Sequence, residues 1–390
     1  MIAVIADDFT GAAEIGGVGL RYGLNVLIET VVNKAEGVDL LVIATDTRSL
    51  CAEEASQVVK RITGELLELE PVFIFKKIDS VLRGHVAMEL EALMCVADKS
   101  KALIVAANPS MGRTIVKGKY FVDSLPLNET SFADDPEFPV HSADVADIVK
   151  PSEYPVFSVG LNDSMPDRGI MIADVASIGE LSRWATKTNQ EMAVAGGSDF
   201  FDALLGTMHT PRVAASHTDL SFGESSLFIF GSMYPKPVNM LEKFYSNNVV
   251  KMNMPEGIYY HANRYSGLLN EWSSQIADRL KNGYSVIVTI EHQPENETSL
   301  SLHIRESIGR LVSMVENQFD LNDLFIEGGA TTSVVLKYLN INKLYPYNEA
   351  DFGVIQMKAE GYPNMCITTK PGSYVWPEHL TFESSNPAIS

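Results

Sequence analysis

The stretch MIAVIADDFTGAAEIGGVGLR at the start of the chain constrains the fold more than any other. Ile2–Ala6 is a short apolar run without polar alternation, which is typical of a strand buried on both faces of a parallel sheet. Two acids, Asp7 and Asp8, follow it, and Thr10 opens a small-residue helix that we expect to run to about Tyr22. Ligands of open α/β sheets bind where such strands end. The stretch therefore predicts a parallel α/β domain with a binding site beside these acids.

The two adjacent acids have different predicted roles. Asp7 either caps the helix or holds the turn, or it contacts a ligand, and the sequence leaves these roles open. Asp8 is the stronger candidate for chemistry, because a second carboxylate beside the first needs a nearby cation, donor or proton to compensate the repulsion. The glycines inside the predicted helix have the spacing GxGxxxG, so we interpret them as helix–sheet packing residues rather than as a dinucleotide fingerprint.

Length and composition define the class of protein. A chain of 390 residues is too long for one ordinary core and predicts two α/β domains, 1–215 and 216–390. A formal charge of −20 argues against nucleic acid or an anionic membrane as a partner, because both require a basic surface. The chain begins directly with a strand and contains no run long enough to span a bilayer, so we expect a cytoplasmic protein. Cys51, Cys95 and Cys366 form no CxxC pair or zinc pattern, and we expect them to be reduced and buried.

Two later strands deliver polar residues to the same edge as Asp8. Leu40–Thr45 is predicted as a strand, and Arg48 follows it directly. Val72–Phe75 is the next strand, and it leads into the charged stretch Lys76–His85. Because the carboxyl ends of parallel strands meet at one edge of a sheet, we expect these side chains to gather there.

Within KKIDSVLRGH the residues have distinct predicted roles. Arg83 can bind a carboxylate with a two-point fork, Lys77 can neutralise an anion, and Asp79 can accept a hydroxyl proton. Lys76 by itself is typical of a solvated face, and His85 is typical of a helix start. The group as a whole predicts a site for a small anionic molecule.

Two further stretches have functional signatures. The section from Asn108 to Pro136 reads as a long irregular loop, and loops of that length in a compact domain are normally functional. Gly112 to Lys119 does not form a phosphate-binding P-loop, because its spacing is wrong and Tyr120 replaces the magnesium-binding hydroxyl. In the second half, Glu327–Thr332 places two glycines before a predicted helix, whose N-terminus offers amides to phosphate.

These stretches together resemble the four-carbon acid sugar kinase family, whose members phosphorylate threonate, erythronate or 3-oxo-tetronate with ATP. The resemblance covers nearly the whole chain, and its matching pieces are ADDFTGA at 6–12, KIDSVLRG at 77–84, GRT at 112–114 with PLNET at 126–130, and Gly328-Gly329. In that family an N-terminal domain binds the acid sugar and a C-terminal domain binds the nucleotide across a cleft. The resemblance therefore implies two α/β domains with mainly parallel sheets and an active site in the cleft between them.

The resemblance also implies two sets of site residues. The sugar acid would be held by Asp8, Arg48, Asp79, Ser80 and Arg83, with Lys77 added on its own chemistry. ATP would be held by Ser232, Gly328, Gly329, Ala330, Thr331 and Gly372, and Mg²⁺ is expected with the nucleotide. Asp8 and Asp79 are the candidates for the catalytic base. We favour Asp8, because a helix N-terminus and the adjacent Asp7 fix its position.

Three departures from the family pattern lie in the nucleotide half. Ala330 stands where the family has the glutamate of Gly-Gly-Glu-Thr, Pro371 stands where it has the serine of Lys-Ser-Gly, and Met233-Tyr234 replaces a small or polar pair. They leave an alternative to the kinase, namely a non-catalytic sugar-acid-binding protein with a diverged nucleotide domain. The stereochemistry of the substrate, the metal ligands and the formation of a homodimer stay open.

Overall fold

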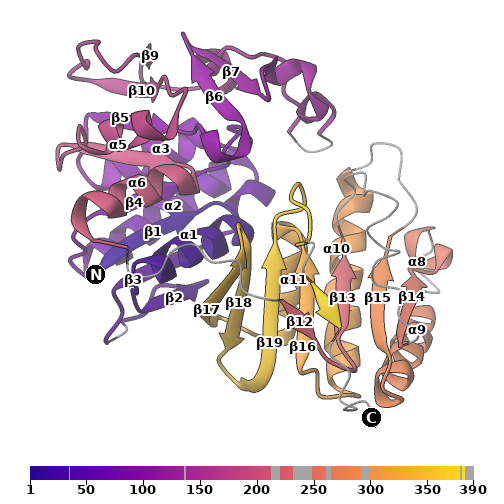
Figure 1. Ribbon diagram of the computed structural model, residues 1–390. Helices are drawn as coiled ribbons and strands as arrows, with labels where there is room; N and C mark the ends of the chain where they lie inside the picture. Colours follow the sequence, from indigo (N-terminus) through magenta and orange to yellow (C-terminus); the bar gives the residue numbers. More distant parts are fainter. Residues whose placement is uncertain are drawn as a thin grey trace. The chain divides into compact units, whose positions relative to one another are not determined.

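The computed structural model describes residues 1–34, 36–135, 138–211, 220–231, 248–260, 265–290, 298–377 and 380–382. The chain divides into two compact units, Met1–Ala214 and Ala215–Ser390. Each unit combines helices with a mainly parallel sheet, so the predicted α/β class is confirmed (Figure 1). Of the helices within the described ranges, none has the length and apolar character needed to cross a bilayer.

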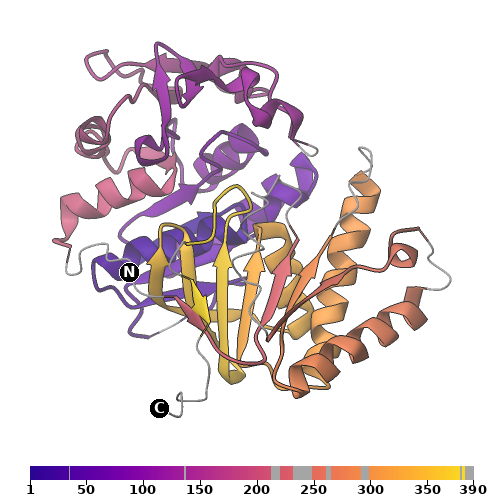
Figure 2. The same ribbon diagram turned by 45° about the vertical axis from the view of Figure 1, so that its right-hand side comes forward.

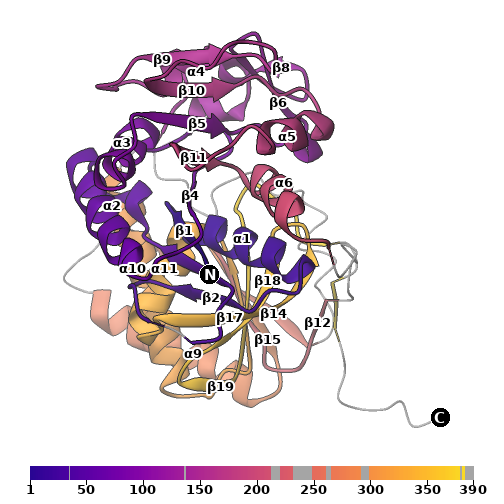
Figure 3. The ribbon, with the colours of Figure 1, turned by 90° about the vertical axis from the view of Figure 1, so that its left-hand side faces the viewer.

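The N-terminal unit is built on a parallel sheet with the strand order β2-β3-β1-β4-β11-β5-β10-β9. Its strands are β1 Ile2–Ala6, β2 Val26–Glu29, β3 Leu40–Ala44, β4 Ile74–Lys77, β5 Lys101–Val105, β9 Val156–Val159, β10 Gly169–Ala173 and β11 Met192–Gly196. Its helices are α1 Phe9–Arg21, α2 Ala52–Leu67, α3 Val86–Val96, the short α4 Val145–Ile148, α5 Ile178–Ala185 and α6 Ser198–Met208. Helices α1 and α6 pack together on one face of the sheet, and α2 and α3 pack together on the other (Figure 3).

The chain reverses its winding direction beside β1. From β1 it passes through α1 to β2 on one side, whereas from β4, the other neighbour of β1, it passes through α3 to β5 on the opposite side. The carboxyl ends of β1 and β4 therefore flank a topological switch point, where open α/β sheets bind ligands. In register, Ala6 lies beside Ala44 and Lys77, so the polar residues that follow these strands start from one edge.

Two parts of this unit differ from the prediction. The section after Asn108 is not an irregular loop, because it contains an antiparallel sheet of β6 Arg113–Val116, β7 Lys119–Val122 and β8 Leu125–Pro126. Lys117 and Gly118 turn the first hairpin with positive φ angles of 50° and 71°, as two-residue hairpin turns require. Strand β11 was not predicted, since MAVAG is short and rich in small residues, yet it lies between β4 and β5.

The C-terminal unit has the strand order β14-β15-β13-β16-β19-β18-β17. The first five strands in this order pair in parallel, and β18 pairs antiparallel with both β19 and β17. Its strands are β13 Leu227–Phe230, β14 Val249–Asn253, β15 Ser285–Thr289, β16 Asp323–Glu327, β17 Lys343–Asp351, β18 Val354–Ala359 and β19 Tyr362–Lys370, and β12 Ser221–Phe222 pairs separately with β20 Thr381–Phe382. Its helices are α8 Glu256–Tyr260, α9 Tyr265–Lys281, α10 Thr298–Glu316 and α11 Gly329–Leu339. The long helices α9 and α10 pack against each other beside these strands (Figure 2).

A second switch point lies between β13 and β16. The chain runs from β13 to β14 on one side, whereas from β16 it continues through α11 to β17 on the other. The predicted strands from 226 to 369 are present, but β17 and β18 were not predicted, although the residues of β17 partly alternate between buried and exposed. The predicted helix from Pro235 to about Tyr245 lies outside the described residues.

The cysteine prediction is only partly right. All three thiols are free, as expected, and Cys366 is buried in β19. Cys51 and Cys95, however, are exposed. Cys51 precedes the first turn of α2, and Cys95 lies on the outer side of the last turn of α3, which explains their exposure.

Candidate functional site

The end of β1 places two carboxylates at the sheet edge. Asp8 is the N-cap residue of α1, where its Oδ1 accepts a hydrogen bond from the Gly11 amide and its Oδ2 accepts one from the Thr10 hydroxyl, both at 2.8 Å. A Cβ at position 11 would lie 2.6 Å from Asp8 Oδ1 and 3.0 Å from Lys77 Nζ, so a larger residue there would displace the capping carboxylate or the lysine. The sequence left open whether Asp7 caps the helix, and the structure shows that Asp8 does so.

Arg48 compensates both carboxylates. It lies in a short 3-10 helix, η1 (Thr47–Ser49), after β3. Its Nε and Nη2 donate to Asp7 Oδ2 at 3.0 and 2.8 Å, and its Nη1 donates to Asp8 Oδ2 at 3.3 Å. A third carboxylate oxygen, Asp79 Oδ1, lies 3.7 Å from Nη1. The cation that the paired acids require is therefore Arg48, at the predicted edge.

Burial and charge move the pKa values of the two acids in opposite directions. Burial raises the pKa of Asp7 above its ordinary value, and Arg48 offsets this only in part. Among the described residues, Asp7 Oδ1 is also buried without a hydrogen-bond partner. Burial acts on Asp8 as well, but Arg48 and Lys77 outweigh it and hold the pKa of Asp8 below its ordinary value. Asp8 therefore stays ionised at neutral pH.

A second ion pair forms in the turn after β4. Asp79 Oδ2 accepts hydrogen bonds from the amides of Val81 and Arg83 and from Arg83 Nε, while Oδ1 accepts one from Arg83 Nη2 at 2.9 Å. Arg83 Nη1 also donates to Asp135 Oδ2 at 2.7 Å. Burial by itself would raise the pKa of Asp79, but Arg83 and Arg48 hold it well below its ordinary value. Both predicted substrate-binding arginines are thus balanced by the protein's own acids.

Both lysines of the charged stretch are buried. Lys77, the last residue of β4, donates to the Ile78 carbonyl at 3.0 Å and lies 3.5 Å from Glu14. The expectation of a solvated Lys76 is wrong, because its side chain is 0% exposed and its Nζ lies 2.8 Å from Glu89 Oε2. The physical reason is that β4 continues to Lys77, beyond the predicted end of the strand, so Lys76 is a strand residue that pairs with α3.

Ser80 connects the site to an arginine that the sequence prediction left out of it. Its Oγ accepts a hydrogen bond from Arg113 Nη1, and its carbonyl accepts one from the Tyr120 hydroxyl. The buried Arg113 guanidinium lies 5.6 Å from the centre of the Phe132 ring, which Arg83 also approaches at 5.4 Å. The available signal was the position of Arg113 in a long section between two sheet strands, where functional residues concentrate.

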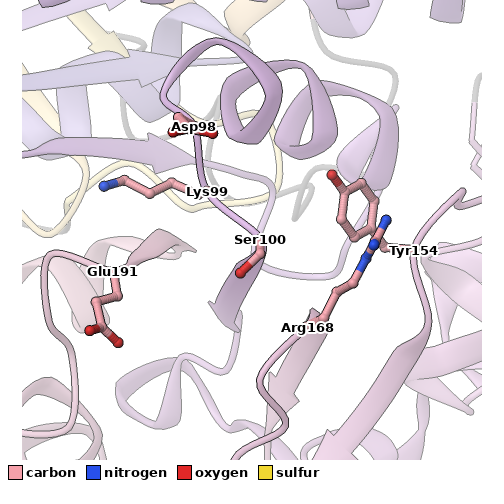
Figure 4. Close-up of a pocket in the computed structure, with 6 residues that line it drawn as sticks. All are labelled: Asp98, Lys99, Ser100, Tyr154, Arg168 and Glu191. Atoms are coloured by element: carbon pink, nitrogen blue, oxygen red, sulfur yellow. The ribbon is translucent and has the colours of Figure 1, made fainter.

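A separate pocket lies at the opposite edge of the same sheet. It has a volume of about 550 Å³ and is lined by Asp98, Lys99, Ser100, Tyr154, Arg168 and Glu191 (Figure 4). Ser100, Arg168 and Glu191 immediately precede β5, β10 and β11, which places the pocket at the amino ends of the strands. Arg168 lies over the Tyr154 ring at 5.3 Å. The pocket is therefore distinct from the cluster around Asp8 and Asp79.

In the C-terminal unit, Gly328 and Gly329 connect β16 to α11. Gly328 is the N-cap residue with a φ of 96°, which L side chains rarely adopt, and its amide donates to the Lys370 carbonyl at 2.9 Å. Helix α11 begins at Gly329, and within the described residues no side-chain cap accepts from its first-turn amides. Ala330 and Thr331 belong to that first turn.

The other predicted nucleotide residues are placed less completely. Ser232 and the departure at Met233 lie outside the described residues. Gly231, which directly follows β13, packs against the α11 turn, since a Cβ there would lie 2.6 Å from Thr331 Oγ1. The ends of β13 and β16 therefore approach each other closely at the switch point. Gly372 lies in the turn after β19.

Comparison with known proteins agrees with this division into two units. A sequence profile described as a sugar-binding N-terminal domain matches residues 2–200, and one described as a nucleotide-binding C-terminal domain matches residues 227–374. D-threonate kinase of Salmonella typhimurium is 38% identical over 164 residues, which is 41% of this chain and 39% of that protein. D-erythronate kinase of Heliobacterium modesticaldum is 38% identical over 154 residues, which is 38% of this chain and 35% of that protein. Each match thus spans less than half of the relative's length.

Solved structures share the fold. A Salmonella typhimurium LT2 protein has a TM-score of 0.76 with 19% identity, covering 96% of each chain. Haemophilus influenzae protein HI1011 has a TM-score of 0.67 with 19% identity, covering 97% of this chain and 98% of that one. The fold and the two profile matches define a protein with a sugar-binding unit followed by a nucleotide-binding unit. This chain belongs to the four-carbon acid sugar kinase family.

Proposed function

We propose that this protein is an ATP-dependent kinase that phosphorylates a hydroxyl of a four-carbon sugar acid such as threonate, erythronate or 3-oxo-tetronate. One observation carries the proposal. In each unit, a loop with a distinctive composition follows a strand beside the switch point of the sheet, namely β4 in the first unit and β16 in the second. Ligands of such folds bind at this position. In the first unit that loop is rich in charge, and in the second it is rich in glycine and helix-terminal amides. The named relatives and the two domain descriptions support the same pairing.

In the N-terminal unit, the proposal assigns the sugar acid to the cluster around Arg48 and Arg83. The acids hold each guanidinium in a fixed orientation, which limits the entropy lost on binding. Three of the five guanidinium hydrogens of Arg48 are used in its bonds to Asp7 and Asp8, which leaves two for a ligand or for Asp79, whose Oδ1 lies 3.7 Å from Nη1. Asp8, which stays ionised, is the candidate for accepting the proton of the reacting hydroxyl.

In the C-terminal unit, the proposal assigns the ATP phosphates to the turn before α11. Backbone can approach a phosphate closely at Gly328 and Gly329, and the helix N-terminus favours negative charge. Within the described ranges, no group of three or more His, Cys, Asp or Glu side chains could hold a metal. We therefore expect Mg²⁺ to arrive with the nucleotide and to be held largely by its phosphates, where it neutralises charge during transfer.

A non-catalytic sugar-acid-binding protein is the second candidate. The ion pairing of Lys370 inside the protein supports it. Lys370 is nearly fully buried, pairs with Glu327 at 3.3 Å, and donates to the carbonyls of Pro371 and Tyr374. Lys370 is therefore already paired inside the protein, and the departures at Ala330 and Pro371 remove two further polar side chains of the family pattern from this half.

An ATP-consumption assay with a panel of tetronates separates the two candidates. We expect ADP release only when threonate, erythronate or 3-oxo-tetronate is present, accompanied by the phosphorylated acid in mass spectrometry. Tetronate binding by calorimetry without ADP release would establish the non-catalytic candidate instead. Neither binding nor turnover with any tetronate would contradict both.

The variant Gly328→Ala tests the nucleotide assignment. The combination of φ 96° and ψ 135° is sparsely populated and costs an L residue about 1–3 kcal/mol, so the loop should relax and move the α11 amides away from the phosphates. We expect ATP affinity to fall by about 10-fold in calorimetry, the equivalent of ~1.4 kcal/mol. Gly361→Ala is the matched control, because Gly361 has a φ of 84° with nothing within 4 Å and lies in the β18–β19 hairpin. Equal ATP affinity of the two variants would contradict the assignment.

A further inference from the structure

The first turn of α6 contains a buried hydroxyl without a hydrogen-bond partner among the described residues. Ser198 is the first residue of this helix and is 2% exposed, and its Oγ has no hydrogen-bond partner within the part of the chain that the structure describes. A buried polar group without a partner is costly and calls for an explanation, of which an absent ligand is one. Ser198 Oγ is therefore a candidate hydrogen-bonding group for a ligand.

The backbone at the start of α6 has no side-chain cap among the described residues. The helix is capped by Gly197, which has no side chain, so no cap accepts from the first-turn amides. Helix α6 runs for 11 residues, long enough for a helix dipole at its N-terminus. The Gly197 amide itself donates to the Val105 carbonyl at 3.1 Å, which fixes the turn to the end of β5.

This turn adjoins the candidate sugar-acid site. Strand β11, which precedes it, is the parallel neighbour of β4, and the Ile78 amide donates to the Gly196 carbonyl at 3.1 Å. A Cβ on Gly197 would lie 3.9 Å from the Cβ of Ser80. Gly197, the residue before Ser198, is therefore a direct neighbour of Ser80. Helix α6 thus begins at the sheet edge that also carries Asp79.

The groups beside Ser198 match a neutral hydroxyl better than an anion. The next residue, Asp199, is half-buried, and its carboxylate accepts hydrogen bonds from the Ser110 hydroxyl at 2.9 and 3.0 Å and from the Ser110 amide at 3.3 Å. A ligand carboxylate would be repelled by Asp199, whereas a hydroxyl can donate to one oxygen and accept from an amide or from Ser198. The turn thus combines donors with acceptors.

We propose that Ser198 and the N-terminal turn of α6 form a subsite that binds one hydroxyl of the sugar acid. This inference rests on the proposed function and adds a specificity-determining residue to it. The arginines would orient the charged end of the substrate, while the α6 subsite would recognise a hydroxyl along its chain. A site built to hydrogen-bond a hydroxyl discriminates strongly against analogues that lack it.

Ser198→Ala tests the subsite in calorimetry with the tetronate that the wild type binds. We expect about 10-fold weaker binding, because one hydrogen bond to the ligand is lost. The unliganded variant should melt at the wild-type temperature or above it, since an unpaired buried hydroxyl has been removed. Thr63→Val is the matched control, because it removes a buried hydroxyl of the same unit whose partner is the Val59 carbonyl on α2. It should bind the tetronate as the wild type does.

The deoxy analogues 2,3-, 2,4- and 3,4-dihydroxybutanoate identify the hydroxyl. The wild type and Ser198→Ala should bind one of the three equally and differ on the other two, because that analogue lacks the recognised group. Ser198→Cys, which keeps a weak donor, should bind the full acid with intermediate affinity and serves if the alanine variant folds poorly. Wild-type affinity of Ser198→Ala, or equal losses on all three analogues, would overturn the subsite while leaving the proposed function intact. If the wild type bound no tetronate at all, both would fail.

Discussion

Asp8→Asn should lower kcat by about 10²-fold or more with little change in affinity for the sugar acid. Asparagine caps helices as well as aspartate does, and it can still accept from the Gly11 amide, so the start of α1 should persist. What it lacks is the ionised oxygen that takes a proton. In a loose phosphoryl-transfer transition state that proton leaves late, so a positioned carboxylate of low pKa suffices. Steady-state kinetics with the best tetronate measure the effect.

Asp79→Asn is the informative comparison. The Asp79 carboxylate accepts four hydrogen bonds, of which two come from the side chain of Arg83 and two from backbone amides. Its replacement should release Arg83 and raise KM, and it should also lower stability. If Asp79→Asn instead lowers kcat alone while Asp8→Asn mainly raises KM, the two roles must be exchanged.

The pH profile gives an independent check on Asp8. Its folded-state pKa lies below the ordinary value of 3.8, so the fold favours the ionised form. The resulting stability is present above pH 3.8 and is lost as the pH falls through the lower, folded value. Activity that depends on ionised Asp8 should therefore show no acid limb between pH 5 and 7. A limb in that range that Asp8→Asn abolishes would contradict the lowered pKa.

The sequence was sufficient to predict the edge of the N-terminal sheet because the signals there are local. A buried strand followed by acids, and a strand followed by Arg48, place their polar ends together whatever the exact strand order. The contacts of Arg48 with Asp7, Asp8 and Asp79 could not be read in this way. They depend on the order β3-β1-β4, which is a long-range property of the fold.

The features that the sequence did not predict have equally specific causes. β11 consists of small residues whose pattern is weak, so the α6 turn that follows it, with Ser198, was not considered for the site. Arg113 lies in a hairpin whose turn, Lys117-Gly118, is a local signal that was available. For Lys76 the outcome depended on where β4 ends, and boundaries are the least reliable part of any sequence-based assignment.

The buried position of Lys76 leads to the largest expected effect on stability. Lys76 Nζ lies 2.8 Å from Glu89 Oε2 and donates to the Lys77 carbonyl at 3.1 Å, with the lysine side chain 0% exposed and the glutamate side chain 2% exposed. Lys76→Met keeps the volume and removes the charge, so that the buried Glu89 carboxylate keeps the hydrogen bond from the Thr47 hydroxyl at 3.1 Å but loses its cation. We expect the free energy of unfolding of the N-terminal unit to fall by about 3–5 kcal/mol.

Urea denaturation followed by tryptophan fluorescence can measure this in one unit alone. Trp184 lies in the N-terminal unit, and Trp272→Phe with Trp376→Phe leaves it as the single tryptophan of the chain. In that background, Lys76→Met combined with Glu89→Leu should recover most of the lost stability, because no unpaired charge remains buried. Lys101→Met is the control, since its partner Glu191 has a side chain that is 77% exposed, and such pairs contribute at most about 1 kcal/mol. If Lys76→Met costs no more than Lys101→Met, or the double variant is no more stable than Lys76→Met, the buried pair does not have the energetic role argued for it.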